Sequence, residues 1–513
     1  LVPILRQGQP LATDHDVNGP ARRDLAGTRG HVPRVANKVR RALGIGKLHC
    51  GRQGLDITVH ALALPKPAAR IKAVTGWRGV FRALPQGAAE PRRPHSTRVA
   101  PFSGPPISAS VPGMTELAPT APFSPTAKDW DSIVEAATEF RRELHRHPEL
   151  TWQEHKTAAR IRRALDALGI AWQACADTGT VARLAANASG RHIALRGDID
   201  ALPIEEAGTP AWRSTRPGCM HACGHDGHTA ALMAAAAWLR KHEARLPGPV
   251  TLLFQPAEEG GHGARRMIED GALNGVEAVF GWHNWPAIPF GQAVCPDGAV
   301  MAGNGTFRIT LTGAGGHASQ PELCRDPILA AAALVQALQQ VVSRRLTPQN
   351  AAVLSVTSIE APSGDTVIPD HARLGGSIRL ADASDRGVIN GAIREISNAI
   401  ATAHGVSAKV EVFDRYDATV NHPGPAAEMR QALCDTLGSG WQDDALSVPI
   451  MASEDFSYYL KDVPGAFALI GADDGPDHTA PCHNARYDFN DRLLPVVLKV
   501  FARLAGAPTP DTD

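Results

Sequence analysis

The amino-acid sequence predicts an α/β protein: a mostly parallel sheet with helices on both faces, carrying an inserted α+β domain. Between residues 130 and 300, short apolar segments alternate with helix-forming segments, which is typical of parallel sheets covered on two sides. The composition then changes near Met301. From there the predicted order is strand, helix, strand, strand, helix, strand, which is typical of a small ferredoxin-like sandwich.

Composition narrows the class of protein further. The chain has 513 residues, of which 43% are hydrophobic and 20% charged, so it is long enough for more than one globular domain. It contains no run of 18 apolar residues, so we expect no membrane span. Its eight cysteines show no paired spacing, which favours free thiols and a reducing cytoplasm.

The net charge of zero conceals an uneven distribution. Residues 1–113 hold 18 Lys and Arg against 5 Asp and Glu, whereas residues 114–513 hold 34 against 47. The first segment is rich in Pro, Gly and Arg and has no sustained hydrophobic period. We expect it to be unstructured, as upstream sequence translated from a misplaced start before Met114. Its basic residues are scattered, so a transit peptide or nucleic-acid arm is the weaker interpretation, and no nucleic-acid partner is expected.

The first elements of the fold are predicted to be helices. Thr126 and Asp129 have the spacing of a capping box, and apolar residues follow at helical intervals from Trp130 to Leu144. Pro148 ends this amphipathic helix. A second helix is expected over residues 154–168, ending at Gly169.

Three apolar segments that read as strands each run into polar residues. The segments span residues 192–195, 250–254 and 277–280. Open α/β sheets place their sites beyond the carboxyl ends of parallel strands. The side chains in that position are Asp198, Asp200, Glu258, Glu259 and His283. We therefore expect these side chains to share one site.

The domain boundaries follow from the same pattern. Residues 301–417 are predicted to form the inserted lid or dimerisation domain, with strands over 306–312, 352–359, 372–380 and 408–413 and helices over 326–345 and 385–404. Residues 114–300 and 418–513 are the two parts of the main domain. The second part is expected to contain helices over 425–437 and 491–504, with His483 before the last.

The loop over residues 221–228 has the highest density of chemically active side chains. It places Cys223 two residues before His225, directly ahead of a helix-forming run that starts at Thr229. Thiolate and neutral imidazole are ligand types that Zn²⁺ and similar ions take. Since unpaired burial of so many titratable groups is costly, the loop indicates a metal site more than a solvated polar turn.

Taken together, the motifs resemble those of a known family. In order they are Leu144–Leu150 (LHRHPEL), Arg196–Pro203 (RGDIDALP), Cys223–His228 (CGHDGH), Phe254–Gly260 (FQPAEEG), Gly281–His283 (GWH), Gly315–Ala318 (GGHA), Val367–Pro369 (VIP), Ser453–Phe456 (SEDF) and Tyr487–Asp491 (YDFND). Over about residues 127–506 the chain closely resembles the hippurate hydrolase and indoleacetyl-amino-acid hydrolase branch of the aminoacylase-type metallopeptidases.

The resemblance implies an enzyme with two divalent metal ions per subunit and a small-molecule substrate. The implied metal ligands are Cys223, His225, Glu259, His283 and His483. This mixed set of sulfur, nitrogen and oxygen donors suits Zn²⁺, Mn²⁺, Co²⁺ or Ni²⁺, and the sequence does not choose among them. By spacing alone His478 is a rival of His483, and the YDFND segment favours His483.

The resemblance also implies catalytic residues. Glu258 matches a base that takes a proton from the attacking water and returns it to the leaving nitrogen. Asp200 lies where relatives orient a ligand imidazole. His317, in the inserted domain, matches a residue that reaches the substrate carbonyl across a homodimer. Separately, Arg379 ends an apolar strand, where it either binds a substrate carboxylate or pairs with a surface acid.

The remaining polar residues of these motifs are expected to support the site. Asp198 and Asp226 would fix histidine orientation, whereas His228 and His262 would be structural or solvated. His145 and His147 lie near a helix end, where they are either functional or only support packing.

The chain departs from the family pattern at three positions. They are Thr366, Glu322 and Ala452, none of which is a predicted ligand. Substrate specificity is therefore less well defined than the chemistry.

The leading functional interpretation is metal-dependent hydrolysis of N-acyl or N-aroyl amino acids to a carboxylate and a free amino acid. A dipeptidase or an N-acetyl-amino-acid deacetylase on the same scaffold is the nearest alternative. A catalytically silent dimeric binding protein is an alternative from another class, and the complete ligand set with Glu258 argues against it.

Overall fold

The computed structural model describes residues 129–510. The predictions made for residues 1–113 and for Thr126 fall outside the described residues. The first described helix, α2 (Trp130–Arg146), is capped by Asp129, whose side chain accepts a hydrogen bond from the backbone N–H of Ser132 at 2.8 Å. Ser132 accepts one in return from the N–H of Asp129 at 3.2 Å. The capping box therefore begins at Asp129, and its predicted placement three residues earlier was wrong.

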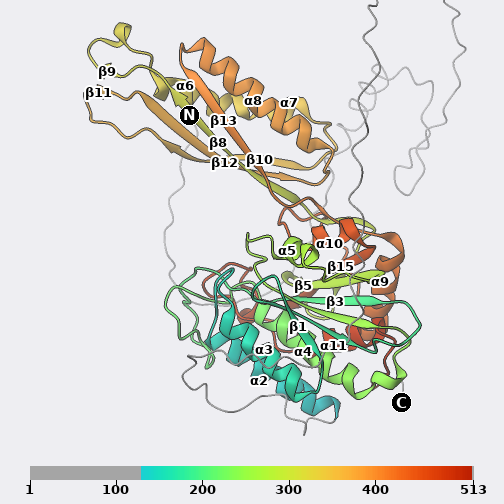
Figure 1. Cartoon of the computed structure of the whole chain (residues 1–513). Coiled ribbons are helices and arrows are strands. Elements are labelled where there is room, and N and C mark those ends of the chain that lie inside the picture. The colour runs from blue at the N-terminus through green and yellow to red at the C-terminus, as the bar shows by residue number, and fades with distance from the viewer. Residues whose placement is uncertain (1–128, 511–513) are drawn as a thin grey trace, which may run out of the picture. The chain divides into compact units, whose positions relative to one another are not determined.

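A seven-stranded sheet lies at the centre of the main part of the fold (Figure 1). In spatial order its strands are β1 (Trp172–Cys175), β2 (Gly179–Leu184), β4 (Val250–Gln255), β3 (Ile193–Asp198), β5 (Ala278–Pro289), β15 (Gly465–Asp473) and β6 (Ala293–Val294). The four strands β4, β3, β5 and β15 run parallel, and antiparallel strands flank them on both sides. The predicted sheet is confirmed, with its parallel strands at the centre.

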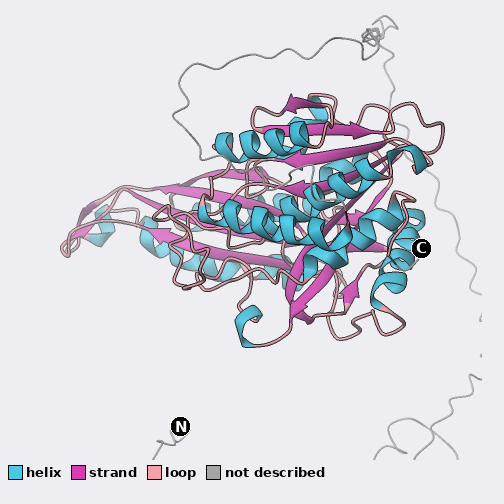
Figure 2. Ribbon diagram, turned by 90° about the horizontal axis from the view of Figure 1, so that it is seen from below, coloured by secondary structure: helices cyan, strands magenta, loops and turns pink. Residues whose placement is uncertain are grey.

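Helices cover both faces of this sheet (Figure 2). Leu252 and Phe254 of β4 belong to one apolar cluster, whereas Leu253 between them belongs to the other, as the period of two in a strand requires. One face carries α2, α3 (His155–Ala167), α4 (His225–Lys241), α9 (Pro423–Leu437) and α11 (Leu493–Leu504). The other carries the short helices α5 (Gly263–Glu269) and α10 (Ser457–Asp462). Because both faces are covered, every residue of the central strands β3 and β4 is buried.

Strand β5 is longer than its sequence suggests. The apolar run was expected to end near residue 280, but the strand continues to Pro289. His283 pairs with Leu469 of β15 within the parallel ladder. This histidine therefore lies inside a strand, and its predicted place beyond the strand end was wrong. Pairing with β15, which comes almost 200 residues later, extends the strand through polar residues.

The residues predicted to form an inserted domain build a separate four-stranded antiparallel sheet. Its spatial order is β10 (Ala352–Glu360), β12 (His371–Leu380), β8 (Gly303–Thr312) and β13 (Ser407–Asp414). Helices α6 (Pro327–Leu338), α7 (Gln340–Arg345) and α8 (Asp385–Ala403) pack on one face (Figure 1). The expected single helix over 326–345 is divided at Gln339, whose N–H bonds the carbonyl of Gln336 three residues back.

The chain enters and leaves this second sheet at one place. Strand β7 (Gly298–Met301) leads into it, and β14 (Thr419–Asn421) leads out and pairs with β7. A small two-stranded sheet, β9 (Gly316–His317) and β11 (Val367–Ile368), belongs to the same inserted part. Among the helices of residues 129–510, none is long and apolar enough to cross a membrane.

Candidate active site

A left-handed glycine separates two predicted ligands at the start of α4. Gly224 has φ +93°, and a Cβ at this position would lie 2.2 Å from Oδ1 of Asn284. Only glycine combines that backbone conformation with so close an approach. The turn fixes Cys223 just before the helix and His225 in its first turn, and both side chains are buried.

The structure brings the five predicted metal ligands together. Ligand atoms of Cys223, His225 and His283 lie within 4.8 Å of one another, and so do those of Cys223, Glu259 and His483. Sγ of Cys223 is 3.4 Å from Nε2 of His283. The two groups share Cys223. They draw on four segments of the chain that are distant in sequence.

Two of these donor atoms are buried and have no hydrogen-bond partner. His225 donates from Nδ1 to the carbonyl of Asp200 at 3.0 Å, and its buried Nε2 makes no hydrogen bond, although Oδ2 of Asp198 lies 3.5 Å away. Oε1 of Glu259 is also unpartnered, although Nε2 of His483 lies 3.1 Å away. His283 donates from Nδ1 to the carbonyl of Asn284, so its Nε2 carries a lone pair toward Cys223. Unpartnered buried polar atoms are costly, and a bound divalent cation would satisfy these. The donor set therefore fits a metal centre.

Asp200 organises the loop that carries the two glutamates. Its Oδ1 accepts from the N–H of Glu258 at 3.1 Å, and its Oδ2 accepts from the N–H of Glu259 at 3.0 Å. The hydroxyl of Thr151 donates to Oδ2, and Nδ1 of His225 lies 3.2 Å from Oδ1. One carboxylate thus positions an imidazole and the backbone of two other site residues.

The glutamate loop turns sharply, so both consecutive carboxylates face the same space. Ala257 has φ +56°, which bends the chain directly after β4. Glu258 and Glu259 both line the same pocket. On an extended strand their side chains would point to opposite sides.

Burial and neighbouring charge shift the pKa values of these groups. Burial raises the pKa of Glu258 well above its usual range, and the nearby Glu454 and Glu259 raise it further. Burial opposes protonation of His225, but Asp198 and Asp200 outweigh it and raise the pKa of His225 to about 10. Burial and the neighbouring His228 hold the pKa of His283 well below its usual range. Contact with Cys482, together with burial, raises the pKa of the Cys223 thiol. Strongly shifted groups gathered in one cavity are typical of catalytic sites.

Two further buried networks support the donor cluster. Asp198 accepts from Nδ1 of His228 at 2.6 Å and from Arg196 at 2.6 Å. Asp226 bonds Nδ1 of His145 at 2.8 Å. Both aspartates therefore hold histidines, as predicted. His145 and His228 are buried and paired, whereas His147 is partly exposed.

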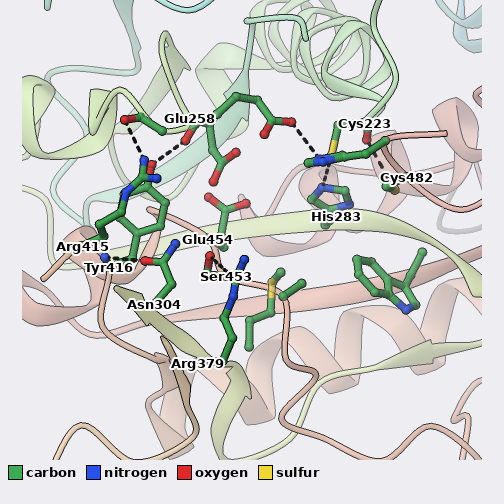
Figure 3. Close-up of a pocket in the computed structure, with 16 residues that line it drawn as sticks. Cys223, Glu258, His283, Asn304, Arg379, Arg415, Tyr416, Ser453, Glu454 and Cys482 are labelled. Carbon is green, nitrogen blue, oxygen red and sulfur yellow. Dashed lines mark hydrogen bonds and ion pairs between the residues drawn. The ribbon is translucent and has the colours of Figure 1, made fainter. Parts of the chain in front are cut away.

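A pocket of about 360 Å³ opens onto the donor cluster (Figure 3). The donors Cys223, Glu259, His283 and His483 line it together with Glu258. The predicted Arg379 also lines it, and its Nη1 donates to Oγ of Ser453 at 2.8 Å. Cavities of this volume are at the lower end of the range for small-molecule sites.

Sequence reasoning missed several residues of this pocket. They are Asn304, Arg415, Tyr416 and Cys482, together with the apolar Trp285 and Met301. The hydroxyl of Tyr416 donates to the carbonyl of Glu258 at 2.7 Å. Asn304 lies in β8, and Arg415 and Tyr416 follow β13. These three residues reach the pocket only through tertiary structure, so no local pattern marks them. Cys482 could have been found, because it directly precedes the predicted ligand His483.

Two of the candidate histidines, His317 and His478, belong neither to the pocket lining nor to the donor cluster. His317 is exposed on β9, where Nδ1 accepts from the hydroxyl of Ser319 at 2.7 Å, and it does not line the pocket of its own chain. His478 bonds Asp474 at 2.6 Å and is not a pocket residue. Between the two candidates, the geometry favours His483 as a ligand.

Comparison with known proteins identifies the family. The model of peptidase family M20/M25/M40 matches residues 194–507, so the chain belongs to this family of hydrolases. An IAA-amino acid hydrolase of Arabidopsis thaliana, ILR1-like 2, is 37% identical over 74% of this chain and 86% of its own length. The hippurate hydrolase of Campylobacter jejuni is 36% identical over 71% of this chain and 94% of its own. These relatives confirm the predicted branch of the family.

A solved structure agrees with the fold and with the kind of site. The YXEP protein of Bacillus subtilis, described as a dinuclear metal binding peptidase of family M20, is 33% identical. The similarity covers 73% of this chain and 98% of that one, with a TM-score of 0.64. The predicted fold class and the predicted class of enzyme are therefore confirmed.

Proposed function

We propose that this chain uses two divalent cations to hydrolyse the amide bond of N-acyl or N-aroyl amino acids, releasing a carboxylate and a free amino acid. One observation carries the proposal. Five metal-donor side chains, a buried glutamate and an arginine line or adjoin a single pocket, although they come from distant parts of the chain. A purely structural metal site would not need Glu258 or Arg379 beside it.

The residues that would hold the cations are Cys223, His225, Glu259, His283 and His483. When bound, two such ions polarise the amide carbonyl and lower the pKa of water near the site. The donor set accommodates Zn²⁺, Mn²⁺, Co²⁺ or Ni²⁺.

Glu258 is proposed to move the protons. Its side chain accepts a hydrogen bond from the N–H of Asp455 at 3.2 Å, and its carbonyl is held by the hydroxyl of Tyr416. A buried carboxyl with a raised pKa is suited to take a proton from the attacking water and then give it to the leaving nitrogen. Asp200 would keep Glu258 and the metal donors in place through its bonds to the loop.

Arg379 is proposed to bind the substrate carboxylate. It is half-buried, and its one hydrogen bond goes to the neutral Ser453. In the described part of the chain it has no acidic partner, so the surface ion pair considered from the sequence is not favoured. A guanidinium without an acid can receive a carboxylate in bidentate geometry.

His317 is proposed to act in a second subunit, with residues 301–417 serving as lid and dimerisation domain. His317 does not line the pocket of its own chain, so it could contact the substrate carbonyl only in the pocket of a partner subunit. Exposed apolar side chains support such an interface: Leu323, Ile328 and Leu329 lie at or beside the start of α6, and Val353 and Ile359 lie on the edge strand β10. An uncovered sheet edge beside apolar side chains is suited to a homodimer contact.

Subunit mixing tests this arrangement. The variants Glu258→Gln and His317→Ala should each be inactive alone. If His317 acts across the dimer, exchange of subunits between them should restore about a quarter of the activity, because half the dimers would hold one complete site. Lack of any recovery after proven exchange would contradict action across subunits.

We also propose a cytoplasmic location. The seven cysteines within residues 129–510 are all free, and several lie buried in the core. Free thiols persist in reducing compartments.

The proposed reaction is tested on the full chain reconstituted in turn with each of the four metals. The panel contains N-acetyl, N-benzoyl and N-indoleacetyl amino acids together with dipeptides, and free amine release is measured. Release from the acyl amino acids with metal, and none after chelation, is the expected result. Cleavage of dipeptides alone would favour the dipeptidase, and no cleavage despite full metal loading would favour the silent binding protein.

A further inference from the structure

Two arginines line the pocket, and neither has an acidic partner. Arg379 at the end of β12 donates to the hydroxyl of Ser453, and Arg415 just after β13 donates to the carbonyl of Gly260 at 2.8 Å. Both bonds are to neutral acceptors. Within residues 129–510, no carboxylate lies in ion-pair contact with either guanidinium. Figure 3 labels both arginines among the lining residues, with Arg415 near Tyr416 and Arg379 near Ser453.

The position of Arg415 is determined by the loop that carries the glutamates. Gly260 has φ +101°, and a Cβ there would lie 2.5 Å from Nη2 of Arg415. The absence of a side chain lets the guanidinium lie against the backbone directly after Glu258 and Glu259. The neighbouring Tyr416 bonds the carbonyl of Glu258, and its ring lies 5.4 Å from the guanidinium carbon of Arg415. Arg415 is thus held beside the reacting groups.

Two cations facing one small cavity repel each other. Burial and the charge of Arg415 both lower the pKa of Arg379. Within residues 129–510, none of the pocket acids Glu258, Glu259 and Glu454 forms an ion pair with either arginine. Glu454 is bonded to Arg196 at 2.7 Å, and Glu259 is among the proposed metal donors. A bound anion would relieve the repulsion and use N–H donors that the two arginines leave free.

One carboxylate does not require both arginines. A single guanidinium already matches both oxygens of a carboxylate through two parallel hydrogen bonds. The two arginines are anchored to separate segments, Arg379 to the 453 loop and Arg415 to the 260 loop. The arrangement is therefore suited to two anionic groups on one ligand.

We propose that the pocket is selective for dianionic substrates, namely N-acyl derivatives of aspartate or glutamate, with Arg379 binding one carboxylate and Arg415 the other. This inference rests on the proposed amidohydrolase function, and it narrows the substrate class. Arg415 would be a specificity-determining residue that contacts the side-chain carboxylate of the amino acid, while Arg379 binds the α-carboxylate. The competing explanation is that Arg415 only fastens the Gly260 loop.

The test compares ligands of nearly equal shape that differ in charge. Turnover of N-acetyl-glutamate and N-acetyl-glutamine is measured with the metal-loaded full chain, and binding of both is measured by calorimetry with the Glu258→Gln variant. The acidic ligand should be preferred at least tenfold in kcat/KM and in affinity, as expected for a charge-assisted contact. Arg415→Gln should abolish that preference through KM, with little change for N-acetyl-glutamine.

A matched control separates recognition from support of the loop. Arg386 bonds the carbonyl of Tyr416 at 2.7 Å and the carboxylate of Asp417, but it does not line the pocket. Arg386→Gln should disturb the same segment while leaving the charge preference intact. The inference would be overturned if the unsubstituted chain had equal kcat/KM and equal affinity for the two ligands. It would also be overturned if Arg415→Gln lowered kcat/KM for both ligands by the same factor. Charge-selective binding without any turnover would support it while refuting the proposed reaction.

Discussion

Replacement of Asp200 by asparagine tests whether one carboxylate holds the metal centre together. Asp200 accepts hydrogen bonds from Thr151, Glu258 and Glu259 and contacts the imidazole of His225, with two of these groups at each oxygen. Asparagine keeps one oxygen and presents N–H donors where the other stood. Two of the four contacts are therefore lost whichever way the amide lies, and the negative charge is lost with them.

The expected loss of metal affinity follows from that count. Substitution of a residue that hydrogen-bonds a metal ligand typically lowers the affinity for the metal 10- to 100-fold. Asp200 contacts the imidazole of the proposed ligand His225 and the backbone N–H of the proposed ligand Glu259. Because two ligands depend on it, we expect a loss of affinity at the upper end of this range. We expect affinity to fall about 100-fold, or about 3 kcal/mol. The assay is competition with a chelating indicator under anaerobic, reducing conditions.

A matched control is available in Asp443. Its carboxylate accepts from the N–H groups of Ala445 and Leu446, both at 2.8 Å, and it does not line the pocket. Asp443→Asn should bind metal as the unsubstituted chain does. If Asp200→Asn also bound both ions with unchanged affinity, Asp200 would have no role in holding the donors.

Three further predictions concern catalysis, pH and assembly. Glu258→Gln should retain both metal ions but lose 10²- to 10⁴-fold in kcat, measured with the best substrate of the panel; near-normal turnover would exclude Glu258 as the proton carrier. Burial opposes protonation of His145, but Asp226 raises its pKa from 6.5 to about 9, so its stabilising effect is complete below pH 6.5 and is lost as the pH rises through 9. In urea titrations between pH 6.5 and pH 9, the free energy of unfolding of the unsubstituted chain should therefore fall by roughly 3 kcal/mol more than that of His145→Gln. If the free energies of the two proteins changed in parallel with pH, the pairing of His145 with Asp226 would be refuted. Glu at positions 323 and 329, in place of Leu323 and Leu329, should yield monomers in light scattering, and a persistent dimer would place the interface elsewhere.

Much of the fold could be predicted because its signals are local. The apolar run of β4 and the helical spacing of α2 follow from the neighbouring residues alone. The end of β5 could not be predicted in this way, because its polar half, including His283, is held by the distant strand β15. The cap of α2 was misplaced because Asp129 and Ser132 form a box that the sequence offers equally at Thr126.

In the candidate site, too, some residues could be predicted from local sequence and others could not. The donors follow strand ends or compact motifs, so Cys223 and Glu259 are visible in the sequence. Arg415 and Asn304 stand in segments without a motif and enter the pocket only because β7 and β14 bring the inserted sheet back to the main one. The proposed action of His317 in a second subunit could not be derived from the spacing of residues within one chain.

Anomalous diffraction from crystals grown with zinc tests the central claim most directly. We expect two zinc peaks in each subunit, both bonded to Sγ of Cys223, one also to the imidazoles of His225 and His283 and the other to Glu259 and His483, with bonds of about 2.0–2.3 Å. A single peak, or two peaks away from these five side chains, would contradict the two-metal account.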